Sequence, residues 1–351
     1  MSEVLTILGA GAMGSALTVP ALDNGHEVRL WGTRLDDDLL DAVDAGRAHP
    51  RTGVVGDPRV RTFRSDRLAE ALSGATAVVL AVSTEGFEDV LAATTPHLRP
   101  GQFLGLTTKG FGEDRDGRII VLTDRADAVL GEAGCRTPIV AIGGPCKANE
   151  VAARRPTAAV HAAVDPAVAA RSHDLFSTPV YAAAAHHDRT GVEVAAALKN
   201  VYAIALGVCH GMADAGGEPF HDLNALVFTR AVAEMAALSV ALGGETDTVT
   251  GLAGVGDLQV TALSGRNRVY GARIGAGERP DEALRLMREA GQTVEGVPAA
   301  TSAARLRDQL VADGAVDRDG FPLLAAIEEL VTDPAVDTSV EALARRLVVV
   351  P

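Results

Sequence analysis

The chain has 351 residues and a net charge of −14, a length that suggests two domains. Apolar residues make up 47% and charged residues 22%, the balance of a globular protein with a large core. Aromatic residues make up only 3%, so Ala, Val and Leu must fill that core. The acidic balance argues against nucleic acid or an anionic membrane as the general partner, although a local cationic pocket for an anionic substrate is still compatible with it.

Three cysteines (Cys135, Cys146 and Cys209) are widely spaced, without a CxxC pair or a His-rich stretch, which fits neither a disulfide framework nor a metal site. The N-terminus has neither the basic region nor the cleavage pattern of a leader peptide. No apolar run reaches the roughly 18 residues needed to cross a bilayer. We therefore expect a cytoplasmic protein with no metal and no membrane insertion.

The first half of the chain alternates strand-like and helical stretches, which predicts an α/β fold with a doubly wound, mostly parallel sheet of the Rossmann type. The expected strands are 4–8, 27–31, 76–82, 103–108, 138–143 and 157–162.

From residue 191 the pattern changes to helices, and convincing strands disappear. The expected helices are 191–212, 221–242, 280–290, 299–312 and 323–331. We therefore predict a Rossmann domain at 1–188 and an all-helical substrate domain at 189–351. His186 and His187 precede that boundary. Adjacent histidines on a strand point to opposite faces, so we expect a hinge turn there rather than a metal site or a proton relay.

A glycine-rich motif, GAGAMG at 9–14, follows the first strand and opens a helix, the context in which GxGxxG indicates dinucleotide binding. The first glycine would permit the tight turn, the second the approach of a pyrophosphate and the third close helix–strand packing. The helix N-terminus would add unpaired N–H groups. The cofactor residues predicted here are Gly9, Gly11, Ala12, Met13, Gly14 and Ser15.

The end of the second strand indicates which dinucleotide is bound. It reads Trp31-Gly32-Thr33-Arg34, without the acid that usually holds the ribose hydroxyls of NAD. Arg34 instead suits a 2′-phosphate, which favours NADP(H) over NAD(H). The acidic run 36–38 could oppose this choice, or it could cap the next helix.

Only three of the 32 basic residues are lysines: Lys109, Lys147 and Lys199. Arginine stays protonated in proteins, whereas a buried lysine can be tuned to exchange a proton. Lysines that persist in such an arginine-rich chain are therefore either candidates for proton transfer or chance survivors, and we expect Lys147, after the Gly-Pro-Cys turn, to be solvated.

Several further motifs occur in a fixed order. They are TTKG at 107–110, GPCKANEVA at 144–152, GVEVAAALKN at 191–200, GLAGVGDL at 251–258, RNR at 266–268 and VEGV at 294–297. With the glycine loop, they resemble the motifs of the NAD(P)-dependent glycerol-3-phosphate dehydrogenase family from residue 9 to about residue 297.

The resemblance implies an oxidoreductase that interconverts dihydroxyacetone phosphate and sn-glycerol 3-phosphate by hydride transfer. It gives Lys199 the role of proton donor and acceptor, and burial near another cation would tune such an amine. Lys109 would polarise the carbonyl, Asp257 would orient the lysine, and Asn200 would bind substrate or cofactor.

The same resemblance places the substrate phosphate on Arg266 and Asn267, with Thr261 adding a hydroxyl. Gly144 and Cys146 would also touch the substrate. Lys109, Ala148, Arg266 and Glu295 would complete the cofactor site, and a homodimer is expected.

Two departures from the family pattern bear on the substrate. A cysteine, Cys146, replaces the serine of the family's GPS turn, and the segment 213–230 is altered. They leave open a relative acting on another small phosphorylated or phosphonate hydroxy substrate. A nucleotide-sensing protein without turnover is a further alternative, although it would not need Lys109, Lys199 and Asp257.

Overall fold

The computed structural model describes residues 2–348. The chain forms two compact units. The first comprises the residues up to Gly112 together with 121–193, and the second comprises 113–120 and the residues from Val194 onward. The division therefore falls inside helix α8 (Arg189–Gly216), and the hairpin segment 113–120 belongs to the second unit.

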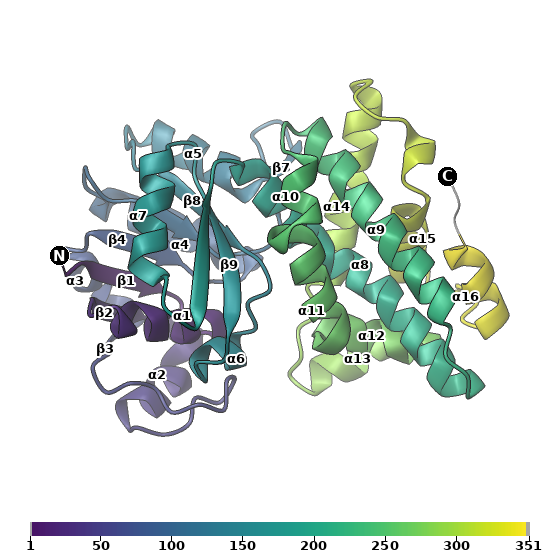
Figure 1. Cartoon of the computed structure of the whole chain (residues 1–351), viewed down its shortest axis with the longest axis horizontal. Helices are drawn as coiled ribbons and strands as arrows, with labels where there is room; N and C mark the ends of the chain where they lie inside the picture. The colour runs from purple at the N-terminus through teal and green to yellow at the C-terminus, as the bar shows by residue number, and fades with distance from the viewer. Residues whose placement is uncertain (1, 349–351) are drawn as a thin grey trace. The chain divides into compact units, whose positions relative to one another are not determined.

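The first unit is built on an eight-stranded sheet in the order β10-β9-β8-β5-β4-β1-β2-β3 (Figure 1). Every neighbouring pair is parallel except β8 and β9. The predicted Rossmann-type sheet is confirmed. Its strands are β1 (Val4–Leu8), β2 (Glu27–Trp31), β3 (Arg61–Phe63), β4 (Ala77–Leu80), β5 (Leu104–Leu106), β8 (Ile139–Gly143), β9 (Thr157–Ala162) and β10 (Tyr181–His186).

Helices cover both faces of this sheet. Successive strand residues point to opposite sides, and apolar strand residues on each side pack against helices. Leu5 and Ile7 pack in one buried cluster with α1 (Ala12–Asp23), α2 (Asp37–Asp44), α6 (Ala148–Ala152) and α7 (Pro166–Phe176). Leu8 packs in a second cluster with α3 (Leu68–Leu72), α4 (Thr84–Thr94) and α5 (Leu122–Glu132). The strand order reverses beside β1, the position at which such sheets bind ligands.

Four strands were missed from the sequence: β3, β10 and the pair β6 (Phe111–Glu113) and β7 (Ile119–Val121). β3, β6 and β7 have three residues each, too short to show a period. β10 reads YAAAAH, and alanine favours helix over strand. Pairing along the whole length of β9 overrides that local preference.

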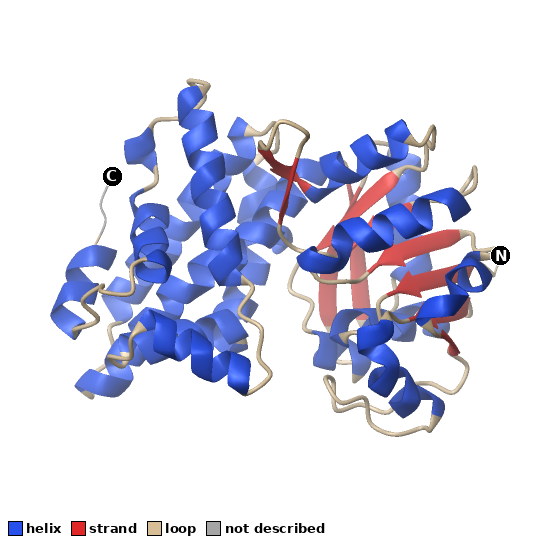
Figure 2. Ribbon diagram, turned by 180° about the vertical axis from the view of Figure 1, so that it is seen from behind, coloured by secondary structure: helices blue, strands red, loops and turns tan. Residues whose placement is uncertain are grey.

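The second unit is mostly helical, as Figure 2 shows by colour. Its helices after α8 are α9 (His221–Ala241), α10 (Thr246–Thr250), α11 (Asp257–Ser264), α12 (Arg266–Gly275), α13 (Pro280–Glu289), α14 (Gly296–Ala312), α15 (Pro322–Thr332) and α16 (Val340–Leu347). A π-helical turn, Leu252–Gly256, precedes α11.

Within residues 2–348, two helices are long and apolar enough to cross a membrane by length and composition, which the expectation from apolar runs did not anticipate. The segment Arg189–Ala215 of α8 is one, and its most apolar stretch is completely buried in the protein. It behaves as the core helix of the second unit. The other is α9, of which a large part is exposed.

Four glycines bring α8 and α12 into backbone contact: Gly207 and Gly211 on α8, and Gly271 and Gly275 on α12. A Cβ atom on Gly207 would lie 2.2 Å from the carbonyl oxygen of Arg268, and one on Gly211 would lie 1.9 Å from that of Ala272. From the other side, a Cβ on Gly271 would lie 2.0 Å from the carbonyl oxygen of Ile204. Only glycine fits such an approach. The start of α12 is thereby fixed against the helix that carries Lys199.

Candidate active site

The glycine loop has the geometry that its sequence predicts. Gly9 has φ +112°, and a Cβ there would lie 2.6 Å from the carbonyl oxygen of Ala81. A Cβ on Gly14 would lie 1.9 Å from the carbonyl oxygen of Gly9, so this glycine permits helix α1 to pack against the turn. Ala12, Met13 and Gly14 form the first turn of α1, where backbone N–H groups lack intrahelical partners. This cradle fits a dinucleotide pyrophosphate.

Sequence reasoning missed two residues beside this loop, His49 and Arg51. A Cβ built on Gly11 would have one neighbouring side chain within 4 Å, the Arg51 guanidinium at 3.6 Å. The His49 imidazole is buried and lies 3.0 Å from the carbonyl oxygen of Ala10. No motif marks the loop that carries them, so only the fold could find them.

The end of β2 presents Arg34 to solvent. Arg34 begins a short 3-10 turn, Arg34–Asp36, and its side chain is exposed. Asp36 is buried and accepts hydrogen bonds from the backbone N–H and the hydroxyl of Thr33, both at 2.9 Å. Asp36 is one of the three acidic residues that could repel a 2′-phosphate. Its carboxylate instead caps the 3-10 turn through Thr33.

Lys109 follows β5 at the same edge of the sheet as the glycine loop, since the strands are parallel. Its backbone oxygen accepts a hydrogen bond from the Thr84 hydroxyl at 3.0 Å, and its side chain is half-buried. Gly110 has φ +155°, and a Cβ there would lie 2.6 Å from the Thr84 hydroxyl oxygen. Lys109 belongs to the first unit, and its catalytic role stays a prediction.

The turn after β8 carries Gly144 and Cys146, and Ala148 begins α6 behind it. Gly144 has φ +114°. The Cys146 thiol donates to the carbonyl oxygen of Ala158 at 3.1 Å and contacts the Tyr181 hydroxyl, so it points back to the sheet. The thiol is therefore engaged within the protein, and the contact of Cys146 with the substrate stays a prediction.

Lys199 and Asp257 form a buried ion pair in the second unit. Lys199 lies on α8 with 6% of its surface exposed, and Asp257 opens α11 with 1% exposed. A carboxylate in the first turn of a helix is also stabilised by the helix dipole. The predicted partnership of these two residues is present in the structure.

Asn200 and Asn267 are both buried, and they join α8 to the starts of α12 and α14. The Asn267 amide nitrogen donates to the Asn200 side-chain oxygen at 2.9 Å, and its oxygen accepts from the Gly296 N–H at 2.8 Å. Asn200 also donates to Glu295 at 3.4 Å. The Asn267 side chain thereby bridges α8, α12 and α14, and its contact with the substrate phosphate stays a prediction.

Arg266 is the first residue of α12, and its guanidinium lies 3.2 Å from the Glu295 carboxylate. Both side chains are substantially exposed, at 52% and 42%. Thr261 lies one turn after Asp257 on α11, on the same face of that helix. A guanidinium beside the unpaired N–H groups of a helix N-terminus is an arrangement that can bind a phosphate.

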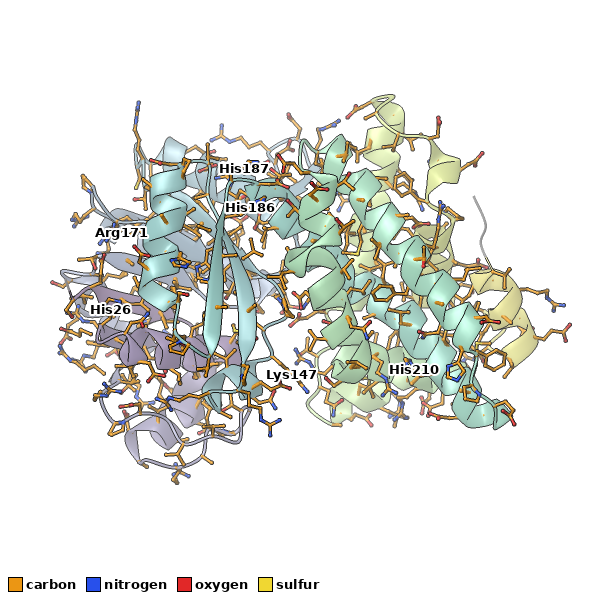
Figure 3. All side chains as sticks on the ribbon, viewed as in Figure 1. His26, Lys147, Arg171, His186, His187 and His210 are labelled. Atoms are coloured by element: carbon orange, nitrogen blue, oxygen red, sulfur yellow. The ribbon has the colours of Figure 1, made fainter. Side chains whose placement is uncertain are left out.

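The histidines before α8 differ from expectation. The rings of His186 and His187 stack with centroids 4.7 Å apart, rather than pointing to opposite faces (Figure 3). The strand ends at His186, so the period-two alternation no longer applies to His187. Asp188 then accepts a hydrogen bond from the Gly191 N–H at 2.7 Å, at the beginning of α8.

Two family models match this chain in sequence. The model described as the N-terminus of NAD-dependent glycerol-3-phosphate dehydrogenase matches residues 4–169. The corresponding C-terminus model matches residues 188–337.

Individual relatives agree. The NADP(+)-dependent glycerol-3-phosphate dehydrogenase of Archaeoglobus fulgidus is 38% identical over 311 residues, covering 88% of this chain and 91% of its own. The glycerol-3-phosphate dehydrogenase [NAD(P)+] of Geobacter sulfurreducens is 35% identical over 310 residues, covering 87% and 88%. The crystal structure of glycerol-3-phosphate dehydrogenase from Coxiella burnetii superposes with a TM-score of 0.82 at 26% identity, covering 99% of each chain. The motifs, the fold and these matches place the chain in the family of NAD(P)-dependent glycerol-3-phosphate dehydrogenases.

Proposed function

We propose that this protein reduces dihydroxyacetone phosphate to sn-glycerol 3-phosphate, and catalyses the reverse reaction, with a nicotinamide cofactor. The observation that carries the proposal is the buried Lys199–Asp257 pair, linked through Asn200 and Asn267 to the exposed Arg266. The relatives reported above are named for glycerol 3-phosphate, and they give no support to a phosphonate substrate or to a sensor without turnover.

Lys199 supplies the proton in this reaction. A nicotinamide cofactor held at the glycine loop would supply the hydride for the carbonyl carbon, and the carbonyl oxygen needs a proton. The Lys199 ammonium gives that proton and takes it back in the oxidation direction. Asp257 holds the ammonium in place and balances its charge.

Arg266 supplies the positive charge for the substrate phosphate. It stands at the N-terminus of α12, where the N–H groups of the first turn add donors. The salt bridge to Glu295 orients the guanidinium before substrate arrives. The phosphate would therefore bind at the start of α12, the helix that packs against α8, and α8 carries Lys199.

The enzyme should oxidise NADPH or NADH with dihydroxyacetone phosphate and much less with dihydroxyacetone. Arg266→Ala should raise KM for the phosphorylated ketone roughly ten- to a hundredfold, the effect of losing a charge-assisted contact. Steady-state kinetics with both ketones measures this.

A matched control is Arg305→Ala, which removes an arginine of similar exposure from α14. It should leave KM unchanged. An equal loss with both ketones in Arg266→Ala would assign Arg266 a structural or cofactor role, and no turnover of dihydroxyacetone phosphate by the unmodified protein would refute the function itself.

NADP(H) is the preferred cofactor in this proposal. Arg34 is exposed at the end of β2, and Asp36 is held by Thr33 away from a competing role. The relative from Archaeoglobus fulgidus is named as NADP(+)-dependent. A guanidinium at this position can pair with the 2′-phosphate that distinguishes NADP(H).

Arg34→Ala should lower kcat/KM for NADPH by roughly ten- to a hundredfold and leave NADH nearly unaffected, because the 2′-hydroxyl needs no cation. Kinetics with each cofactor checks this, with Arg61→Ala on the exposed part of β3 as the control. A preference of the unmodified enzyme for NADH would contradict the assignment.

A homodimer is the proposed assembly, with the outer face of α9 as its contact. Ala225, Thr229, Ala233, Ala237 and Val240 form an exposed uncharged stripe along this helix. The charged residues of its middle, Arg230 and Glu234, are instead turned inward and paired with each other. In a protein of net charge −14, such a face lets two copies approach with little repulsion.

Ala233→Arg should convert a dimer into a monomer by placing a charge at the centre of the stripe. Light scattering coupled to size-exclusion chromatography measures the mass. Ala92→Arg, on the exposed side of α4, should leave the dimer intact. A monomeric unmodified protein, or a dimeric Ala233→Arg variant, would contradict this contact.

A further inference from the structure

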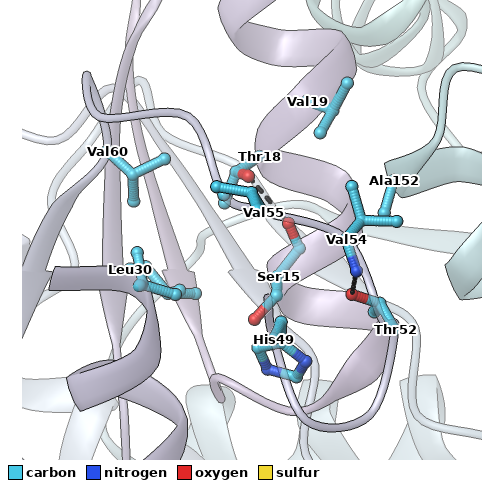
Figure 4. Close-up of a pocket in the computed structure, with 12 residues that line it drawn as sticks. Ser15, Thr18, Val19, Leu30, His49, Thr52, Val54, Val55, Val60 and Ala152 are labelled. Atoms are coloured by element: carbon cyan, nitrogen blue, oxygen red, sulfur yellow. Dashed lines mark hydrogen bonds between the residues drawn. The ribbon is translucent and has the colours of Figure 1, made fainter. Parts of the chain in front are cut away.

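The segment between α2 and β3 covers the beginning of helix α1. Together with the helix it forms a small pocket whose wall includes Ser15, Thr18, His49 and Thr52 (Figure 4). The pocket is lined otherwise by aliphatic side chains and a glycine. In this setting a buried imidazole must have its hydrogen bonds satisfied by the protein.

His49 is held by hydrogen bonds of both its backbone and its ring. Its backbone N–H donates to Val54 at 2.9 Å, and its backbone oxygen accepts from Gly53 at 2.8 Å. On the ring, Nδ1 accepts a hydrogen bond from the Arg51 N–H at 3.2 Å. Nε2 lies 3.0 Å from the carbonyl oxygen of Ala10, inside the glycine loop.

These partners define which nitrogen carries the proton. Because Nδ1 accepts from an N–H, the proton must be on Nε2, which then donates to Ala10. Burial also lowers the pKa of His49 and so favours the neutral ring that this pattern requires. The imidazole is thus a fixed donor to the glycine loop.

Ser15 provides a second donor to the same atom, with its hydroxyl 3.0 Å from the Ala10 oxygen. The Ala10–Gly11 peptide is trans, so its carbonyl and N–H point in opposite directions. Holding the Ala10 oxygen toward the pocket therefore directs the Gly11 N–H away from it. Gly11 has no side chain to fix this orientation, and no side-chain hydrogen bond caps α1.

We propose that His49 is a positioning residue for the cofactor: with Ser15 it locks the Ala10–Gly11 peptide so that the Gly11 N–H faces the cofactor pyrophosphate. The same ring bond to the Arg51 N–H sets the turn that places the Arg51 guanidinium beside Gly11. The inference rests on the use of a nicotinamide dinucleotide by this protein.

The test is equilibrium binding, independent of turnover. His49→Leu should weaken binding of both NADPH and ADP-ribose about five- to tenfold, the effect of losing one such hydrogen bond. His49→Gln keeps a donor at the end of the side chain and should recover much of the affinity. Ser15→Ala should act in the same direction, with a non-additive double variant, because both groups hold one oxygen.

The matched control is His161→Leu, which removes another buried histidine of the first unit. His161 lies on β9, and its ring forms a hydrogen bond with the Ser172 hydroxyl at 2.8 Å. It should lower the melting temperature without changing the affinity for NADPH. Adenosine, which lacks the pyrophosphate, should bind equally to the unmodified protein and His49→Leu.

Equal affinity of His49→Leu and the unmodified protein for ADP-ribose would overturn the proposal, as would equal losses in His49→Leu and His161→Leu. Failure of the unmodified protein to bind NADPH or NADH would instead refute the use of the cofactor.

Discussion

The buried ion pair of Lys199 and Asp257 is the constraint on which the rest of the second unit depends. Removing one partner of such a pair typically destabilises a protein by about 3–5 kcal/mol, because an uncompensated charge is left inside. The surroundings of the pair help to compensate its buried charges, because Asp257 lies at the start of α11, where the helix dipole stabilises a negative charge. Keeping a lysine there is costly for stability and useful for proton transfer.

Close backbone packing links this ion pair to Arg266, the residue proposed to bind the phosphate. The glycines of α8 and α12 let the two helices touch, and the Asn200–Asn267 bond fixes their register. Asn267 then holds the first N–H of α14, next to Glu295, which in turn pairs with Arg266. A side chain larger than hydrogen at Gly207 or Gly271 would separate Lys199, the proposed proton donor, from Arg266, the residue proposed to bind the phosphate.

Motifs predicted the parts of the protein whose chemistry is local. The alternation of strands and helices and the glycine loop follow from residue type and spacing, whereas the Lys199–Asp257 partnership follows from the family resemblance, and the structure contains all three. The inward turn of Cys146 and the bridging contacts of Asn267 depend on hydrogen bonds with neighbours that come together only in the folded chain. His49 lies in a loop without regular period, so its contact with Ala10 exists only in the folded chain.

Chemical rescue tests the central role of Lys199 most directly. Lys199→Ala should lose about 10²- to 10⁴-fold in turnover, as expected for removal of a general acid. Small primary amines such as methylamine should restore part of the rate, in proportion to their ability to exchange a proton, while tetramethylammonium should not. Rescue by both cations alike would show that only charge is needed there, and retention of turnover in Lys199→Ala without added amine would contradict the proton-transfer role.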